Sequence, residues 1–247
     1  MKTRCKFAAM ISASLLVIGA GLIVSQKVSA AGEGKITGTI KLDGTPPHQK
    51  PIDMSKEPSC QAKHAGHPIT TETVVSANGA LQYVVVYLSE GLSGAAANAV
   101  PSEQPEFNQT GCQYVPHVIA LDVGQSFKVV NSDQTSHNIH PQPKPGAGNQ
   151  EWNKSQPPGT PPFVVKWNSE EVAVPVKCNI HPWMHGYMAV VKGPYAVSGE
   201  NGSFTIDGVP PGSYTVSAWQ ELYGTQTQKI TVAAGKPTTA DFTFKAK

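Results

Sequence analysis

The sequence is short of arginine and of charged residues in general. Of its 247 residues 15% are charged, and Arg4 is the only arginine. A chain without further arginines has no planar guanidinium groups for bidentate contacts with phosphate. Charged, helix-forming residues are also too few for long solvent-exposed helices. Nucleic acid is therefore excluded as an expected partner, and long charged helices are excluded as an expected architecture.

Glycine, proline and β-branched residues are abundant instead, with 23 glycines and 21 prolines in the chain. The alternating run 35–42 ends at an Asp-Gly turn, and the apolar run 81–88 is typical of a buried strand. Residues 45–70 are expected to be a connecting loop and 91–109 a connector or a short helical excursion. Residues 141–162, with seven prolines, are expected to be a long loop. The sequence therefore predicts an all-β protein, with further strands at 115–123, 126–131, 163–167, 171–176, 186–191, 203–206, 214–219, 229–232 and 239–244.

The first 30 residues have the pattern of a secretory signal peptide. Lys2, Arg4 and Lys6 precede the apolar run 7–24, and 28–30 is a small-residue cleavage site. A retained membrane anchor is the alternative, because about 18 apolar residues are the lower limit for a span. Cleavage reduces the basic residues from 19 to 15 against 17 acidic ones, a net charge of −2. We expect a periplasmic or secreted protein with no stable membrane insertion after cleavage.

Cleavage leaves three cysteines, an odd number for an exported protein. Cys178 lies beside other candidate metal ligands in the sequence, whereas Cys60 and Cys112 have no comparable set of ligand residues near them. Cys60 and Cys112 are therefore predicted to form a disulfide. The alternative is that Cys60 joins His64 and His67 in a second metal site.

The most informative segment is 178–188, CNIHPWMHGYM. It contains a thiol, an imidazole and a thioether within seven residues, at Cys178, His181 and Met184. Another imidazole, His137, lies 41 residues before Cys178 and is followed by an asparagine. Two imidazoles, a thiolate and a weak axial thioether form the ligand set of a blue-copper site. Zinc fits less well, because it prefers four strong ligands and a thioether is a poor one.

This two-part motif resembles that of the cupredoxins, and its short ligand loop is more similar to that of the amicyanins than to the longer plastocyanin loop. The resemblance covers about residues 112–192. It implies a Greek-key β-sandwich that binds one copper ion, alternating between Cu(I) and Cu(II). Carried over by position, it implies the ligands His137, Cys178, His181 and Met184.

Some ligand assignments have alternatives. Met188 could replace Met184 as the axial ligand, although its place in the following strand favours sheet packing. His140 could replace His137, although only His137 directly precedes the asparagine that the family requires. His117 is expected to be structural.

The resemblance also implies roles around the metal. Asn138 would tie the two ligand loops together and tune the thiolate. Pro182 and Trp183 would form an apolar rim around His181, the edge through which cupredoxins exchange electrons. Trp183 could equally serve only to pack the loop.

The regions on either side have a different character. Residues 34–47 and 201–216 resemble carboxypeptidase regulatory-like, or transthyretin-like, β-sandwich domains. The expected organisation is a signal peptide at 1–30, a discontinuous sandwich at 32–92 and 194–247, and a cupredoxin domain at 93–193. In the alternative, the two domains are consecutive and residues 81–88 lend a strand to the copper domain.

The function expected from this site is electron transfer with a redox protein partner, and not catalysis. Four protein ligands leave no open position for a substrate. A copper enzyme would need a second site, and the remaining histidines show no paired spacing in the sequence (His64, His67, His117, His140 and His185). A copper-binding or delivery protein is the main alternative, and a purely structural exported protein is another.

Overall fold

The computed structural model describes residues 32–47, 50–64, 78–94 and 100–246. The predicted signal peptide and His67 lie outside these residues. Within them almost all regular structure is β-strand, which confirms the predicted all-β class. The one helix of the described residues is α1 (Pro58–Lys63). No helix in this part of the chain is long and apolar enough to span a membrane.

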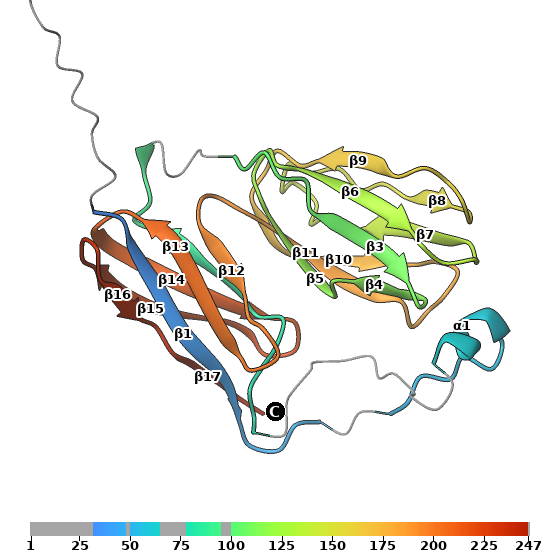
Figure 1. Cartoon of the computed structure of the whole chain (residues 1–247), viewed down its shortest axis with the longest axis horizontal. Coiled ribbons are helices and arrows are strands. Elements are labelled where there is room, and N and C mark those ends of the chain that lie inside the picture. Colours follow the sequence, from blue (N-terminus) through green and yellow to red (C-terminus); the bar gives the residue numbers. More distant parts are fainter. Residues whose placement is uncertain (1–31, 48–49, 65–77, 95–99, 247) are drawn as a thin grey trace, which may run out of the picture. The chain divides into compact units, whose positions relative to one another are not determined.

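Strands from both ends of the described chain form two four-stranded sheets (Figure 1), here called the outer sandwich. One sheet has the order β13-β1-β16 with β17 also paired to β1, and the other has the order β12-β2-β14-β15. The strands are β1 (Gly34–Asp43), β2 (Val85–Glu90), β12 (Tyr195–Val197), β13 (Ser203–Val209), β14 (Gly212–Gln220), β15 (Gly224–Val232), β16 (Pro237–Thr239) and β17 (Phe242–Lys245).

The outer sandwich has an apolar core because its strands alternate. In β1, Ile36 and Ile40 point inward and are completely buried. Phe204 of β13 and Phe244 of β17 belong to the same core. The close packing leaves no room for a side chain at Gly38, where an added Cβ would lie 2.1 Å from the Ala240 carbonyl oxygen.

The segment between β2 and β12 forms two further sheets, here called the inner sandwich (Figure 1). Their orders are β5-β11-β10-β7-β8 and β4-β3-β6-β9. The strands are β3 (Glu106–Thr110), β4 (Gln113–Val115), β5 (Val118–Asp122), β6 (Ser126–Asn131), β7 (His137–Pro141), β8 (Lys154–Gln156), β9 (Phe163–Lys166), β10 (Glu171–Lys177) and β11 (His185–Val191).

Several local expectations are wrong, and one of them is the loop expected at 141–162, which contains β8. The connector expected at 91–109 ends in β3. One of the inward positions of β3 is the polar Gln109, so the strand lacks the alternation of apolar and polar residues by which it could be predicted. The strand expected at 115–123 is divided into β4 and β5 at Pro116, because proline cannot donate to a ladder. The connector 45–70 contains α1, which begins at Pro58, a residue suited to the first turn of a helix.

Strand β2 pairs with β12 and β14, and not with a strand of the inner sandwich. It is therefore not part of the ligand-bearing sheets, in which β3, a strand not expected from the sequence, pairs with β6 instead. The domain limits 32–92, 93–193 and 194–247 stay a prediction.

Apolar and aromatic side chains connect the two sandwiches. Val85 and Trp219 of the outer sandwich share a buried cluster with Val118 and Ala189 of the inner one. The hydroxyl of Tyr195 donates to the Ala120 carbonyl oxygen at 2.9 Å. The described segment therefore has a common buried joint in addition to its two separate cores.

Candidate metal centre

The loop between β10 and β11 is held tightly by its own backbone. The amide of Cys178 donates to the carbonyl oxygen of Met184 at 2.9 Å. The amide of Met184 donates to the carbonyl oxygen of His181, also at 2.9 Å. These two bonds fold the seven-residue segment on itself. Cys178 and His181 are thereby brought to one side of the loop.

The structure brings three of the four expected ligands into one buried cluster. His137 stands at the start of β7, and its Nδ1 lies 3.0 Å from Nδ1 of His181. The sulfur of Cys178 lies 3.7 Å from the same His181 nitrogen. The exposed fractions of these three residues are 0%, 3% and 1% for His137, Cys178 and His181. Met184 is 1% exposed and belongs to the same core cluster as Cys178.

The donor set fits a copper ion. Nε2–H of His137 donates to Oδ2 of Asp133 at 2.9 Å, which leaves the lone pair of Nδ1 directed toward Cys178 and His181. Two imidazole nitrogens and a thiol sulfur then converge with no carboxylate among them, which is a soft-to-borderline donor set. The same three residues suit neither calcium nor magnesium, since those ions prefer oxygen.

Asp133 is a residue that sequence reasoning missed. Its carboxylate accepts the amides of Gly111 at 2.9 Å and Cys112 at 2.7 Å in addition to the bond from His137. Burial raises its pKa, but these hydrogen bonds outweigh burial and lower the pKa to about 2. The only signal in the sequence is its position four residues before His137. That signal is hidden in a polar turn in which Oδ1 of Asn131 accepts the Asp133 amide at 3.0 Å.

Asn138 connects the two ligand segments. Its Oδ1 accepts the amide of Asn179 at 2.7 Å and lies 3.4 Å from the sulfur of Cys178. Its Nδ2 donates to Oδ1 of Asn153 at 2.7 Å. Burial raises the pKa of the Cys178 thiol, but hydrogen bonds, the largest from His137, outweigh it and lower the pKa. The environment therefore favours the thiolate, which is the form that binds a metal.

His181 lies beneath the two residues that were expected to form an apolar rim around it, Pro182 and Trp183. It is buried, and burial followed by repulsion from His137 lowers its pKa. Its Nε2 has no hydrogen-bond partner among the described residues and lies 4.0 Å from a carboxylate oxygen of Glu57. Pro182 is exposed and Trp183 half-buried. Together with Ile180, both line a pocket of about 620 Å³ whose other walls come from residues 50–57.

The segment that covers this rim is anchored by a disulfide between Cys60 and Cys112. Met54 is buried beside this disulfide, and Trp183 packs against the same cluster. A disulfide-bonded Cys60 offers no thiolate to the alternative site with His64 and His67, and His67 lies outside the described residues. His64 instead uses Nε2–H to donate to the Gly111 carbonyl oxygen at 2.7 Å.

The structure also places the alternative ligands. His140 lies outside the buried cluster, with Nδ1 3.0 Å from Oδ1 of Asn179 and Nε2 2.6 Å from a carboxylate oxygen of Glu151. Met188 is completely buried in β11, where it is paired with Val174 and Ile119 of the neighbouring strands. His117 lies elsewhere, at the joint between the two sandwiches.

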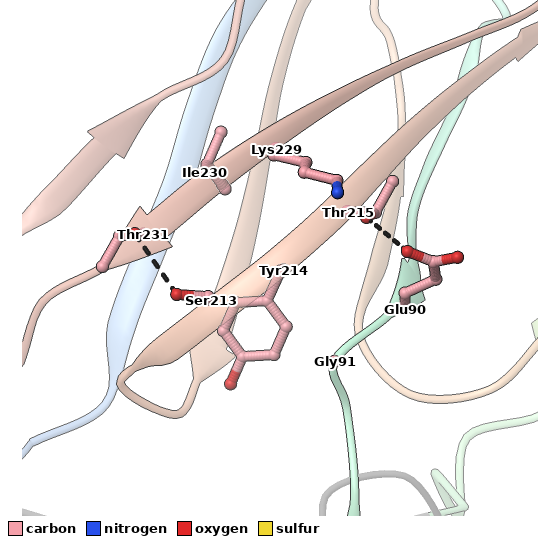
Figure 2. A pocket seen from close by; sticks show the side chains of 8 residues that line it. All are labelled: Glu90, Gly91, Ser213, Tyr214, Thr215, Lys229, Ile230 and Thr231. Atoms are coloured by element: carbon pink, nitrogen blue, oxygen red, sulfur yellow. Dashed lines mark hydrogen bonds between the residues drawn. The ribbon is translucent and has the colours of Figure 1, made fainter.

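A separate pocket of about 440 Å³ lies on the outer sandwich (Figure 2). Glu90 and Lys229 are its charged lining residues, and the carboxylate of Glu90 accepts the hydroxyl of Thr215 at 2.7 Å. Ser213 and Thr231 approach one another across β14 and β15 at 3.4 Å. The lining includes no histidine or cysteine, so this pocket has none of the ligands of the buried cluster.

Comparison with protein families identifies the C-terminal part of the chain. Residues 190–245 match the carboxypeptidase regulatory-like domain. This match includes the motif at 201–216 and confirms the resemblance that the motif carries. A comparison with the curated proteins finds no match.

Similar solved structures are copper proteins. Amicyanin from Paracoccus versutus is 19% identical, with 42% of this chain and 96% of that chain covered and a TM-score of 0.31. A purple cupredoxin from Nitrosopumilus maritimus is 22% identical, with 35% and 99% covered and a TM-score of 0.30. The copper-containing nitrite reductase of Thermus scotoductus SA-01 is 17% identical, with 42% of this chain covered and a TM-score of 0.33. This chain spans about a quarter of that enzyme, 26% of its length.

Proposed function

We propose that this chain binds one copper ion through His137, Cys178, His181 and Met184 and carries single electrons between redox partner proteins. The observation that supports this most strongly is the convergence of two imidazole nitrogens and a thiol from segments 41 residues apart. Each of these residues is almost completely buried. Met184 is buried in the same hydrophobic core as Cys178, and its thioether is of the kind that serves as a weak axial ligand.

The chemistry suits one-electron exchange. Copper, when bound, supplies the Cu(I)/Cu(II) couple. The sulfur ligands favour the reduced ion, and imidazole suits both oxidation states. Asp133 and Asn138 hold the ligand side chains from outside, so the donors move little when the charge changes. Such rigidity suits an electron carrier, because the ligands then rearrange little during each electron transfer.

The wider setting belongs to the same proposal. The copper unit is the inner sandwich, inserted in a discontinuous regulatory-like sandwich with limits at 32–92 and 194–247. The signal peptide directs the chain to the periplasm or outside the cell. Its partner is a redox protein that docks over the pocket at Pro182 and Trp183. Neither nucleic acid nor an active-site substrate has a place in this function.

Titration of the purified protein with Cu(II) tests the copper site. We expect an intense visible thiolate-to-copper charge-transfer band that saturates at one ion per chain. The substitution Cys178→Ser removes the sulfur and abolishes the band, while circular dichroism shows the fold retained. A band that is absent from the wild type, or that survives Cys178→Ser, contradicts the proposal.

Two methionines distinguish the axial ligand. Met184→Leu is expected to shift the band and the reduction potential, because it removes the axial sulfur. Met188→Leu is the matched control, since Met188 is equally buried but lies within β11. The reverse result would assign the axial position to Met188.

The alternative, copper delivery without electron transfer, predicts different behaviour. A carrier shows reversible one-electron voltammetry and keeps its copper in the presence of an acceptor chelator. A delivery protein loses copper readily to that chelator and lacks a reversible couple. The enclosure of the ligands favours the carrier, because a buried ion leaves slowly.

A further inference from the structure

Two histidines and a glutamate that the copper proposal does not use lie together at the joint between the sandwiches. His117 precedes β5, His185 begins β11, and Glu221 follows β14. One ligand atom from each lies within 4.8 Å of the other two. These residues are far apart in the sequence, so spacing alone gives no sign of the cluster.

The geometry directs ring nitrogens toward the carboxylate. Nε2 of His117 lies 3.0 Å from a carboxylate oxygen of Glu221, and the rings of His117 and His185 have centroids 5.5 Å apart. Nδ1–H of His185 donates to the carbonyl oxygen of Trp183 at 3.0 Å. This bond leaves the lone pair of His185 on Nε2, the arrangement that metal-binding histidines commonly have.

The backbone fixes all three positions. The amide of Tyr187 donates to the His117 carbonyl oxygen at 2.9 Å, which ties β11 to the segment carrying His117. A Cβ on Gly186 would lie 2.7 Å from that same oxygen, so the two segments are in close contact. Oε1 of Gln220 accepts the amides of Leu222 and Tyr223, at 2.7 and 3.0 Å, and holds the turn that carries Glu221.

Burial adds an independent argument for a cation. The side chain of Glu221 is only 4% exposed, and that of His117 is 20% exposed. A carboxylate removed from water is costly unless a positive charge compensates it. A divalent ion supplies that charge, and the partly exposed His117 edge gives the ion access.

We propose that His117, His185 and Glu221 bind a second metal ion, a borderline divalent cation such as zinc or copper(II). Imidazole and carboxylate are ligands for such ions, and a set of three protein ligands leaves a coordination position for water. This open position distinguishes the site from the Cys178 centre, whose ligand set is complete. The two sites share no ligand, so each proposal stands or fails separately.

Zinc stoichiometry tests this proposal. Purified protein without a polyhistidine tag is first loaded with one equivalent of Cu(II), cleared of excess metal and then titrated with zinc by calorimetry, with elemental analysis after dialysis. We expect one zinc per chain and no change in the visible copper band. Glu221→Gln keeps the shape and a hydrogen-bond acceptor but removes the charge, and should weaken zinc binding by about 100-fold or more. His117→Gln should have a similar effect.

Glu151→Gln is the matched control, because Glu151 also pairs with a histidine, His140, but has no second histidine beside it. It should bind zinc as the wild type does. The Glu221→Gln comparison is repeated in the Cys178→Ser variant, where the zinc difference should persist without the copper band. Circular dichroism confirms the fold of each variant.

Equal zinc binding by wild type and Glu221→Gln, or no zinc bound beyond the copper, would overturn the second site. In that case the His117–Glu221 contact only ties the sandwiches together. A chain that develops the blue band but binds no zinc disproves this inference alone. A chain that binds zinc through Glu221 but develops no blue band disproves the copper proposal alone.

Discussion

The two sandwiches bury different kinds of polar side chain. In the described part of the outer sandwich the fully buried polar residues are neutral, namely Ser198, Ser217 and Gln220, and the one buried carboxylate, that of Glu221, lies at the joint with the inner sandwich. In the inner sandwich they include acids and imidazoles, namely Asp122, Asp133, Glu171, His137 and His181, together with several amides. The outer sandwich therefore depends mainly on apolar burial, whereas the inner one also depends on a network of polar partners.

Such burial is costly unless each charge has partners. Glu171 has them, since it accepts the amide of Lys144 at 2.6 Å and Nδ2 of Asn149 at 3.2 Å. A set of buried, partnered ionisable groups is typical of a functional site. The contrast indicates that the outer sandwich contributes mainly to the stability of the fold and the inner one to the chemistry of the site. Three substitutions can test this difference.

The largest effect is expected from Phe244→Ala in the outer core. Phe244 is 1% exposed, and removing a buried aromatic ring costs about 4 kcal/mol of the free energy of unfolding. The copper band of the remaining folded protein should be unchanged. Urea unfolding and the visible spectrum measure the two effects. Thr243→Ala, at the neighbouring exposed position, is the control and should change stability by less than about 0.5 kcal/mol.

Asp133→Asn should have a smaller effect on stability but a direct effect on the site. It removes a charged hydrogen bond to His137, which costs about 2 kcal/mol, and loosens the orientation of that ring. Copper affinity should fall by about 10- to 100-fold. Competition with a chelator measures this loss.

Asp241→Asn is the matched control in the outer sandwich, because the exposed Asp241 also accepts hydrogen bonds, from the amide and hydroxyl of Thr39. It should leave copper affinity unchanged. Equal affinities for the two variants would show that Asp133 has no role at the metal centre.

The smallest effect is expected from Asp122→Asn and has the opposite sign. Burial, only partly offset by a hydrogen bond from the Gly193 amide, raises the pKa of Asp122 to about 6. The folded protein then holds this proton more tightly than the unfolded chain, whose aspartate pKa is about 3.9. The free energy of unfolding therefore falls as the pH rises through this interval.

Asp122→Asn removes the ionisable group and with it this fall in the free energy of unfolding at higher pH. We expect a gain of about 1–2 kcal/mol at pH 8, reduced for solvent screening, and almost none at pH 4. Tyr195, the ionisable group that interacts with Asp122, is retained in this variant. Urea unfolding at both pH values measures the difference, and a gain independent of pH would contradict the assignment.

The sequence could predict what depends on local pattern. The alternation in β1 and β6 predicts strands that the structure contains, and the Cys-x2-His-x2-Met spacing predicts a loop that the structure folds tightly around Cys178. Local spacing is sufficient there because a strand or a short loop needs only neighbouring residues to specify it.

Contacts between distant segments could not be predicted. Asp133 meets the disulfide segment at Cys112, and Glu221 meets His117, only after the sheets have assembled. The burial of His181 has the same cause, since it depends on the segment that carries Glu57. No period or spacing in the sequence predicts such long-range contacts.

The pairing of β1 determines the order in which the chain can be completed during synthesis. Ile40 is paired with Phe242, and the amide of Thr39 donates to Asp241 across a separation of 202 residues. Strands β3 to β11 have all been made once residue 191 is added, whereas β1 must wait for β16 and β17. Because the closure of so long a loop is slow, we expect the outer sandwich to be completed after the inner one. The segments that carry the metal ligands can therefore associate while β1 still lacks its partners at the other end of the chain.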